Sequence, residues 1–163
     1  MNRRNILAIC AVTVLGLAML PSSVVGQQKS LKEQIVGSWT LVSCDIKQPF
    51  CTNPVGTLML DASGRYAQLI AARGRPKAAT GATNRADVKP EEYKAMAQGL
   101  LANFGTWSVN EAAKTLTTHL EGALFPNVEG IDVNVSVSLI GDELKTVGAD
   151  PAAAGGIVWR RAK

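Results

Sequence analysis

The chain has 163 residues, of which 47% are apolar and 18% are charged. This length supplies the core of one domain and is too short for two. The formal net charge of +4 comes without a cluster of Lys and Arg, which excludes nucleic acid as an expected partner.

Residues 1–26 have the parts of a secretory signal peptide. Arg3 and Arg4 form its charged region, and an apolar stretch follows as far as Leu20. This stretch is shorter than the roughly 17 to 25 residues that span a bilayer, so a permanent membrane anchor is the weaker interpretation. We expect cleavage, a mature domain over 27–163 and a periplasmic or secreted protein. Cleavage also removes two of the positive charges.

Cys44 and Cys51 are the cysteines that remain after cleavage, with Asp-Ile-Lys-Gln-Pro-Phe between them. In an oxidising compartment such a pair most simply forms a structural disulfide. A redox-active pair is usually spaced Cys-x-x-Cys, and a metal site lacks further ligands because His119 is the only histidine. We therefore predict a disulfide, no metal site and no cofactor.

A short helix is predicted at the start of the mature domain. Ser30 and Glu33 have the spacing of a capping box, and Gly37 ends the helix after Val36. Trp39 then lies near the start of the first predicted strand. The eight strands that we expect cover residues 38–46, 55–60, 65–71, 104–109, 115–121, 131–139, 143–147 and 157–161.

A long loop and a second helix separate the third and fourth predicted strands. Residues 73–88 show no periodicity, and long loops of this kind often serve as lids or binding loops. Pro90 and two acidic residues after it begin the helix. Its apolar residues recur at helical spacing and are Tyr93, Met96, Ala97, Leu100 and Leu101.

The sixth predicted strand has the clearest alternation in the chain. Its apolar residues are Ile131, Val133, Val135, Val137 and Leu139, and polar residues stand between them. Eight such strands with short connections favour an all-β fold whose antiparallel sheet closes into a barrel, because closure removes exposed edges. A two-sheet sandwich is the alternative architecture.

Six segments follow one another along the chain in a recognisable order. They are Val36-Gly-Ser-Trp-Thr-Leu-Val-Ser, Asp61-Ala-Ser-Gly-Arg-Tyr, Pro90-Glu-Glu-Tyr, Asn103-Phe-Gly-Thr-Trp, Thr118-His-Leu-Glu-Gly-Ala-Leu-Phe-Pro-Asn and Val158-Trp-Arg-Arg. This set covers about residues 31 to 161 and resembles the bacterial and fungal lipocalin-like domain family, a group of calycin-like barrels. The resemblance implies an eight-stranded antiparallel barrel with a short N-terminal helix and the second helix inserted between the third and fourth strands.

The resemblance also implies how one end of the barrel is closed. Gly37 opens the first strand, Trp39 closes the barrel floor, and Arg160 or Arg161 packs across the indole ring. A guanidinium over an indole contributes about 0.5 to 2 kcal/mol. These residues are therefore expected to be structural.

The candidate ligand-binding residues are Tyr66, Gln68, Phe104, Trp107, His119 and Phe125. Tyr66 and Gln68 share one face of a strand, and facing inward they would suit a mostly apolar ligand with one polar end. Ordinary sheet packing is the alternative. Phe104 and Trp107 cannot face the same side of a regular strand, and Phe125 would cap a barrel mouth or cover an edge.

His119 and Glu121 are the candidate catalytic residues. They lie two apart on one strand and so share a face, where an imidazole beside a carboxylate could act as a general base. The alternative is that both face solvent. The sequence contains no Ser-His-Asp order, P-loop or dinucleotide-binding fingerprint.

Three functions remain open from the sequence. The first is an exported protein that binds a small hydrophobic molecule inside the barrel. The others are an enzyme of the cyclase or isomerase type, which is less expected, and a packed barrel that acts as a structural or interaction module. The small share of aromatic residues, 5%, favours room inside the barrel. We expect one pocket, between the Phe125 loop and residues 73–88.

Overall fold

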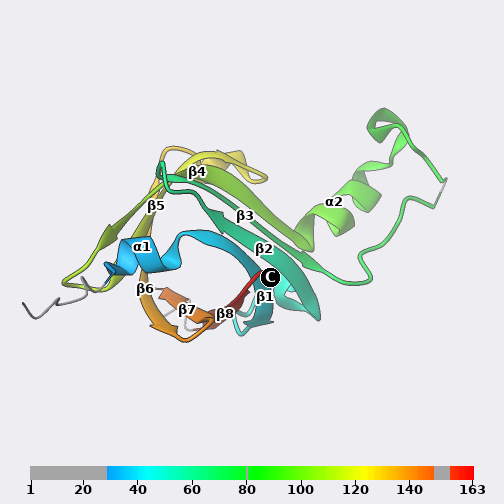
Figure 1. The fold of residues 1–163 in the computed structure, drawn as a ribbon. Helices are drawn as coiled ribbons and strands as arrows, with labels where there is room; N and C mark the ends of the chain where they lie inside the picture. Colours follow the sequence, from blue (N-terminus) through cyan, green and yellow to red (C-terminus); the bar gives the residue numbers. More distant parts are fainter. Residues whose placement is uncertain (1–28, 80, 149–154) are drawn as a thin grey trace, which may run out of the picture.

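The computed structural model describes residues 29–79, 81–148 and 155–163 (Figure 1). The signal peptide predicted over residues 1–26 lies outside this part of the chain. Among the described residues, no helix has both the length and the apolarity that crossing a membrane requires.

The strands form one closed antiparallel barrel, as Figure 1 shows. Each strand pairs with its neighbours in sequence, and the last strand pairs with the first. The strands are β1 (Gly37–Cys44), β2 (Pro54–Leu60), β3 (Arg65–Ala72), β4 (Leu100–Asn110), β5 (Thr115–Ala123), β6 (Asp132–Ile140), β7 (Glu143–Gly148) and β8 (Gly156–Arg161). The predicted barrel is confirmed, and the two-sheet alternative is excluded.

The core lies inside the barrel because alternate residues of each strand point inward. In β6, Val135 and Val137 are partly or fully buried, whereas Ser136 and Ser138 are exposed. The largest fully buried side chains are Ile35, Trp39, Leu60, Ile70, Leu144 and Trp159. The alternation read from the sequence is therefore the alternation of the barrel.

Helix α1 (Leu31–Ile35) covers one end of the barrel, which we call the closed end. The predicted capping box is present, since Ser30 and Glu33 each bond to the other's backbone N–H. A second anchor was not predicted: the Glu111 carboxylate accepts hydrogen bonds of 2.9 Å from the backbone N–H groups of Leu31 and Lys32. This long-range contact ties the helix to the turn between β4 and β5.

Trp39 fills the closed end and is completely buried. Its indole N–H donates to the Ile35 carbonyl at 2.9 Å. The Arg161 guanidinium lies 4.3 Å from the centroid of the Trp39 ring and donates to the carbonyls of Gln34 and Val36. The expected arrangement of tryptophan and arginine is present, and Arg161 is the arginine that makes it.

Arg160 points the other way, because successive residues of a strand face opposite sides of the sheet. It forms an ion pair with Glu143 on the outer surface, at 2.6 Å. Gly37 has a φ of +135° and lies close to Arg161, so that an added Cβ would come within 3.0 Å of the guanidinium. Only glycine combines this backbone conformation with room for the arginine.

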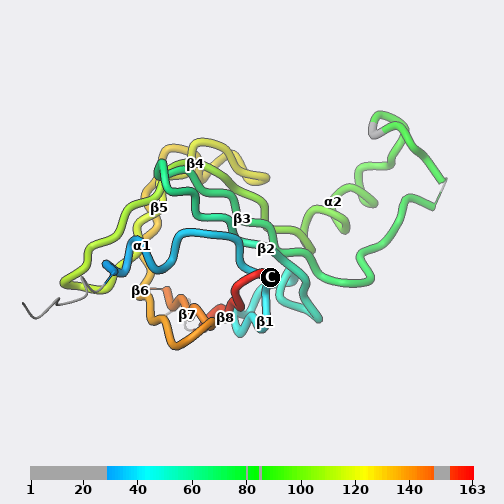
Figure 2. Tube along the Cα trace, in the orientation of Figure 1, coloured from blue at the N-terminus to red at the C-terminus, as the bar shows by residue number. Residues whose placement is uncertain are grey.

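Helix α2 (Pro90–Gln98) and residues 81–89 extend away from the barrel (Figure 2). The prediction that Leu100 and Leu101 belong to this helix is wrong. The helix ends at Gln98, with Gly99 as its C-cap, and the two leucines begin β4, where they pair with Ala71 and Ile70 of β3. Sheet pairing and burial of Leu101 against the core outweigh the local helical spacing.

Candidate functional site

A cavity of about 340 Å³ lies inside the barrel. Its apolar wall includes Leu58, Leu116, Leu120, Val133, Val135 and Ile157. Four polar side chains interrupt this wall, and they are Gln68, Asn103, Thr118 and Thr146. The volume lies within the range of about 300 to 1,000 Å³ that is usual for small-molecule sites. The cavity has the composition of a site for a mostly apolar molecule.

The cavity reaches the end of the barrel opposite Trp39, which we call the mouth. A second hollow of about 500 Å³ lies there and shares Leu101, Asn103 and Val128 with the cavity. Its wall includes Phe50 and Phe125. The two hollows are therefore neighbours at this end of the barrel.

The prediction of one pocket between the Phe125 loop and residues 73–88 is wrong. The hollow beside residues 73–88 is separate: it has about 700 Å³, lies against α2 and shares no lining residue with the barrel cavity. The physical reason is that this segment extends away from the barrel (Figure 1). The mouth is bordered instead by the segments that carry Phe50 and Phe125.

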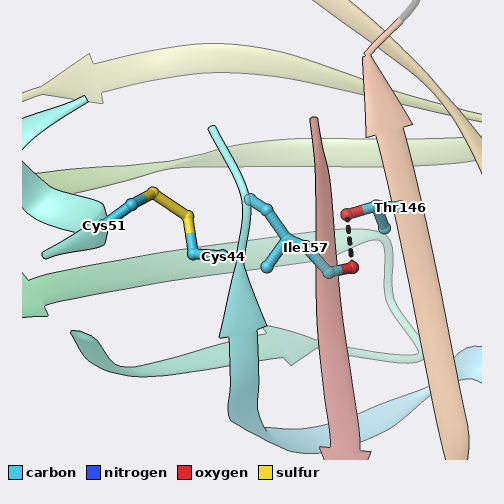
Figure 3. The surroundings of a disulfide bond; sticks show 4 residues. All are labelled: Cys44, Cys51, Thr146 and Ile157. Carbon is cyan, nitrogen blue, oxygen red and sulfur yellow. Dashed lines mark hydrogen bonds between the residues drawn. A yellow bond between two sulfur atoms is a disulfide. The ribbon is translucent and has the colours of Figure 1, made fainter. Parts of the chain in front are cut away.

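The predicted disulfide is present between Cys44 and Cys51. Figure 3 shows it leaving the end of β1 towards the 3-10 turn Pro49–Cys51. On the neighbouring strands, the Thr146 hydroxyl donates to the Ile157 carbonyl at 3.5 Å (Figure 3). The disulfide thus fixes the turn that carries Phe50 beside the mouth.

Three buried polar atoms have no hydrogen-bond partner within the described residues: Tyr66 Oη, Asn103 Oδ1 and Trp159 Nε1. An unpaired buried polar group costs about 1 to 3 kcal/mol. Burial is the main influence on the Tyr66 phenol and raises its pKa, so the hydroxyl is neutral at physiological pH; the adjacent Thr118 side chain acts in the opposite direction. The interior is therefore apolar but has unpaired polar atoms.

His119 and Glu121 share a face, as predicted, and that face is the outer surface. His119 Nδ1 lies 2.8 Å from an Asp132 carboxylate oxygen. Glu121 lies 2.6 Å from the Arg65 guanidinium, whose hydrogen bond lowers the pKa of the Glu121 carboxyl. Neither residue lines the barrel cavity, because Leu120 and its neighbours at alternate positions occupy the inner face.

Phe104 and Trp107 face opposite sides of β4. Phe104 is exposed on the outside, whereas Trp107 is buried and donates from its indole N–H to the Asp61 carbonyl at 2.9 Å. Trp107 lies near α1, with the Lys32 ammonium 5.7 Å from its ring centroid. Of the other ligand-binding candidates, Gln68 lines the cavity and Phe125 lines the mouth.

Sequence reasoning missed Asn103, Thr118, Thr146 and Trp159 as cavity residues. The sequence nevertheless contained an indication of this role for Asn103, Thr118 and Thr146. Each of these polar residues occupies an inward position of its strand, and the inward positions on either side of it hold an apolar residue or a glycine. Thr146, for example, stands between Leu144 and Gly148 in β7. A polar residue at such a position indicates either a packing compromise or a contact to a ligand.

We expect Tyr66→Phe to change the free energy of unfolding of the ligand-free protein by less than about 1 kcal/mol, because the buried hydroxyl has no well-aligned hydrogen bond and only the Thr118 side chain beside it. Urea denaturation followed by tryptophan fluorescence measures the change. A loss of 1 kcal/mol or more would show that the hydroxyl is satisfied in the folded protein.

A family model described as a lipocalin-like domain matches residues 36–160. The match begins just before β1 and ends within β8, so it includes all eight strands of the barrel except for Arg161. A search of curated proteins found no match. The extent of the family match and the closed eight-stranded barrel agree, and the chain belongs to the lipocalin-like domain family.

Proposed function

We propose that this protein is exported and binds a small, mostly apolar molecule inside its barrel. The cavity of about 340 Å³ carries the proposal, because its wall is apolar apart from four polar side chains. Membership of the lipocalin-like family adds support, since small-molecule binding is the kind of function this fold suggests. The ligand would enter between Phe50 and Phe125.

Burial of the ligand's apolar surface would supply most of the affinity. Each Å² of apolar surface removed from water contributes about 25 cal/mol. Association costs several kcal/mol of translational and rotational freedom, so the surplus is far smaller than the total. A ligand that fills both the cavity and the mouth would therefore bind more tightly than one that fills the cavity alone.

The signal-like sequence of residues 1–26 supports export. The disulfide between Cys44 and Cys51 is compatible with it, because disulfides persist in oxidising compartments such as the periplasm and the cell exterior.

The position of the proposed base favours ligand binding over catalysis of the cyclase or isomerase type. A general base must come within hydrogen-bond reach of its substrate. His119 and Glu121 lie outside the barrel and are already paired with Asp132 and Arg65. The cavity likewise counts against a fully packed structural module.

We expect Val135→Trp to weaken binding at least about tenfold, because the indole would occupy the cavity that Val135 lines. The probe is N-phenyl-1-naphthylamine, an uncharged compound whose fluorescence rises in apolar surroundings. Titration of the mature protein with this probe measures the affinity.

Ser136→Trp is the matched control, since it places the same side chain on the outer face of the same strand. It should bind the probe as the unmodified protein does. No binding by the unmodified protein, or equal affinity in the two variants, would reject the proposed site.

A further inference from the structure

Exposed apolar side chains border the mouth of the barrel. Phe125 is 63% exposed and Leu124 is 45% exposed, and both line the hollow at the mouth together with the partly buried Phe50. A single exposed apolar residue is ordinary on a protein surface, whereas several around one hollow mark a surface that contacts another molecule or a membrane. The apolar surface at the mouth is therefore a candidate for such a contact.

The fold brings basic residues from two parts of the chain to the same end of the barrel. The stem of Arg75 lies against Gly99, where an added Cβ would be 2.8 Å from Arg75 Cγ. The residues on both sides of Gly99 line the hollow at the mouth. Lys47, which is distant in sequence, immediately precedes another residue of that lining, Gln48. Positive charge thus lies beside the apolar border of the mouth.

The segment of residues 73–94, which includes most of α2, carries the excess positive charge of the mature domain. It contains six basic and three acidic residues, whereas the rest of residues 27–163 contains nine basic and ten acidic ones. Figure 1 shows this segment extending from the side of the barrel away from α1. Its basic residues are Arg73, Arg75, Lys77, Arg85, Lys89 and Lys94. The charge of the molecule is therefore uneven, and the mouth end is the more positive one.

The basic residues at the start of this segment are available to an external anion. Arg73, Arg75 and Lys77 are exposed, and none of them has an ion-pair partner among the described residues. Three arginines outside the segment, by contrast, each have a carboxylate partner. The Glu92 carboxylate of α2 is engaged within the segment, since it accepts hydrogen bonds from the backbone N–H groups of Ala79 and Lys89.

We propose that the mouth docks on an anionic phospholipid bilayer, with Leu124 and Phe125 in the interface and the basic residues of 73–94 against the lipid phosphates. Apolar side chains gain by leaving water, and Lys and Arg are attracted to anionic head groups. A fluid lipid surface is favoured over a protein partner, because it needs no shape matched to features on separate segments. This inference goes beyond the proposed function and does not require a ligand in the cavity.

Co-sedimentation of the mature protein with vesicles tests the docking. Residues 27–163 contain the whole barrel and lack the apolar stretch before Leu20, which would bind lipid itself. We expect vesicles of equal parts phosphatidylglycerol and phosphatidylcholine to bind at least about tenfold more tightly than phosphatidylcholine alone, since each basic residue near an anionic surface contributes about fivefold. Raising the salt from about 0.1 M to about 1 M should remove most of this difference, because salt screens exposed charges.

A charge variant with a matched control tests which end of the barrel meets the lipid. Removing two charges at the mouth, in Arg75→Gln with Lys77→Gln, should weaken binding to the anionic vesicles at least about tenfold. Lys29→Gln with Lys163→Gln removes the same charge elsewhere, because Lys29 lies beside Arg161 at the closed end and Lys163 follows β8. This control should bind nearly as the unmodified protein does. Equal losses in the two double variants, or no binding of the unmodified protein to anionic vesicles, would overturn the proposal.

The apolar contribution is tested at Phe125. Phe125→Ser should weaken binding to the anionic vesicles about fivefold, because it removes an exposed phenyl ring from the proposed interface. Ile140→Ser is the matched control, since Ile140 is 79% exposed and precedes two residues that line the hollow at the closed end. It should leave vesicle binding unchanged. Circular dichroism melting curves verify that each variant is folded, and a larger loss in Ile140→Ser would contradict the proposed orientation.

A fluorescent reporter gives a measurement that does not depend on a loss of binding. The three native tryptophans are at most 4% exposed, so phospholipids with brominated chains should quench them little. Phe125→Trp should be quenched strongly by anionic vesicles of such lipids, and Ile140→Trp should not. The reverse pattern would overturn the proposal. So would sedimentation velocity that finds a lipid-free dimer which Phe125→Ser dissociates, because the surface would then belong to a second copy of this chain.

Discussion

Replacing Trp39 by alanine is expected to lower the free energy of unfolding by about 3 to 5 kcal/mol. The side chain is completely buried at the closed end, so its removal leaves a large cavity in the core. It also removes the hydrogen bond to the Ile35 carbonyl and the ring on which Arg161 packs. Urea denaturation followed by circular dichroism measures the loss.

Two arginine variants separate the contributions at this end. Arg161→Met should cost more than Arg160→Ala, because Arg161 donates to two carbonyls and covers the Trp39 ring. Arg160 forms an ion pair with Glu143 whose two side chains are about half exposed, and such pairs contribute about 0 to 1 kcal/mol. A loss below 1 kcal/mol for Trp39→Ala, or a larger effect at Arg160, would contradict this account of the closed end.

The barrel could be predicted because its strands carry their pattern locally. Alternation in β6 and the turn residues between strands depend only on neighbouring positions in the sequence. The arrangement of Trp39 with an arginine came from the family resemblance. Which arginine it is follows from the register of β8 against β1, where Trp39 is opposite Arg161.

The boundary between α2 and β4 could not be predicted from local pattern. Leu100 and Leu101 fit the apolar side of a helix as well as they fit the start of a strand. Pairing with β3, a contact distant in sequence, decides the outcome. Propensity and spacing do not contain that information.

Which residues of β4 point into the barrel and which point outward depends on an irregularity in the pairing of β4 with β5 between Phe104 and Gly105. At Gly105 an added Cβ would overlap the His119 carbonyl oxygen, so the close approach of β4 and β5 requires glycine. The sequence shows a glycine there but does not show which backbone approaches it. For this reason the alternation of residues along the strand did not predict that Phe104 points outward.

The candidate site was predicted in part for a related reason. Tyr66 and Gln68 face the interior in accordance with the alternation of β3, and Gln68 lines the cavity. The depth of the cavity depends on how eight strands close around it, which is a property of the whole barrel. Asn103 and Trp159 become notable only when their buried polar atoms are seen to be unpaired.

Replacing Cys44 and Cys51 together by serine is expected to lower the free energy of unfolding by about 2 to 3 kcal/mol, because the disulfide restricts the unfolded chain. The same change releases the turn that places Phe50 at the mouth of the barrel. We therefore expect weaker binding of N-phenyl-1-naphthylamine as well, since a mobile turn must be ordered again around the ligand. Urea denaturation and probe titration measure the two effects on the same preparation.

Reduction of the unmodified protein provides the control for the serine side chains. The reduced protein should match the double variant in both stability and affinity, and reoxidation should restore both. Phe50→Ala with the disulfide intact separates the two effects, because it should weaken probe binding while stability falls less than in the double variant; Phe50 is only partly buried. Unchanged stability after loss of the disulfide would contradict its structural role, whereas unchanged probe affinity in both variants would show that the ligand enters without contacting Phe50.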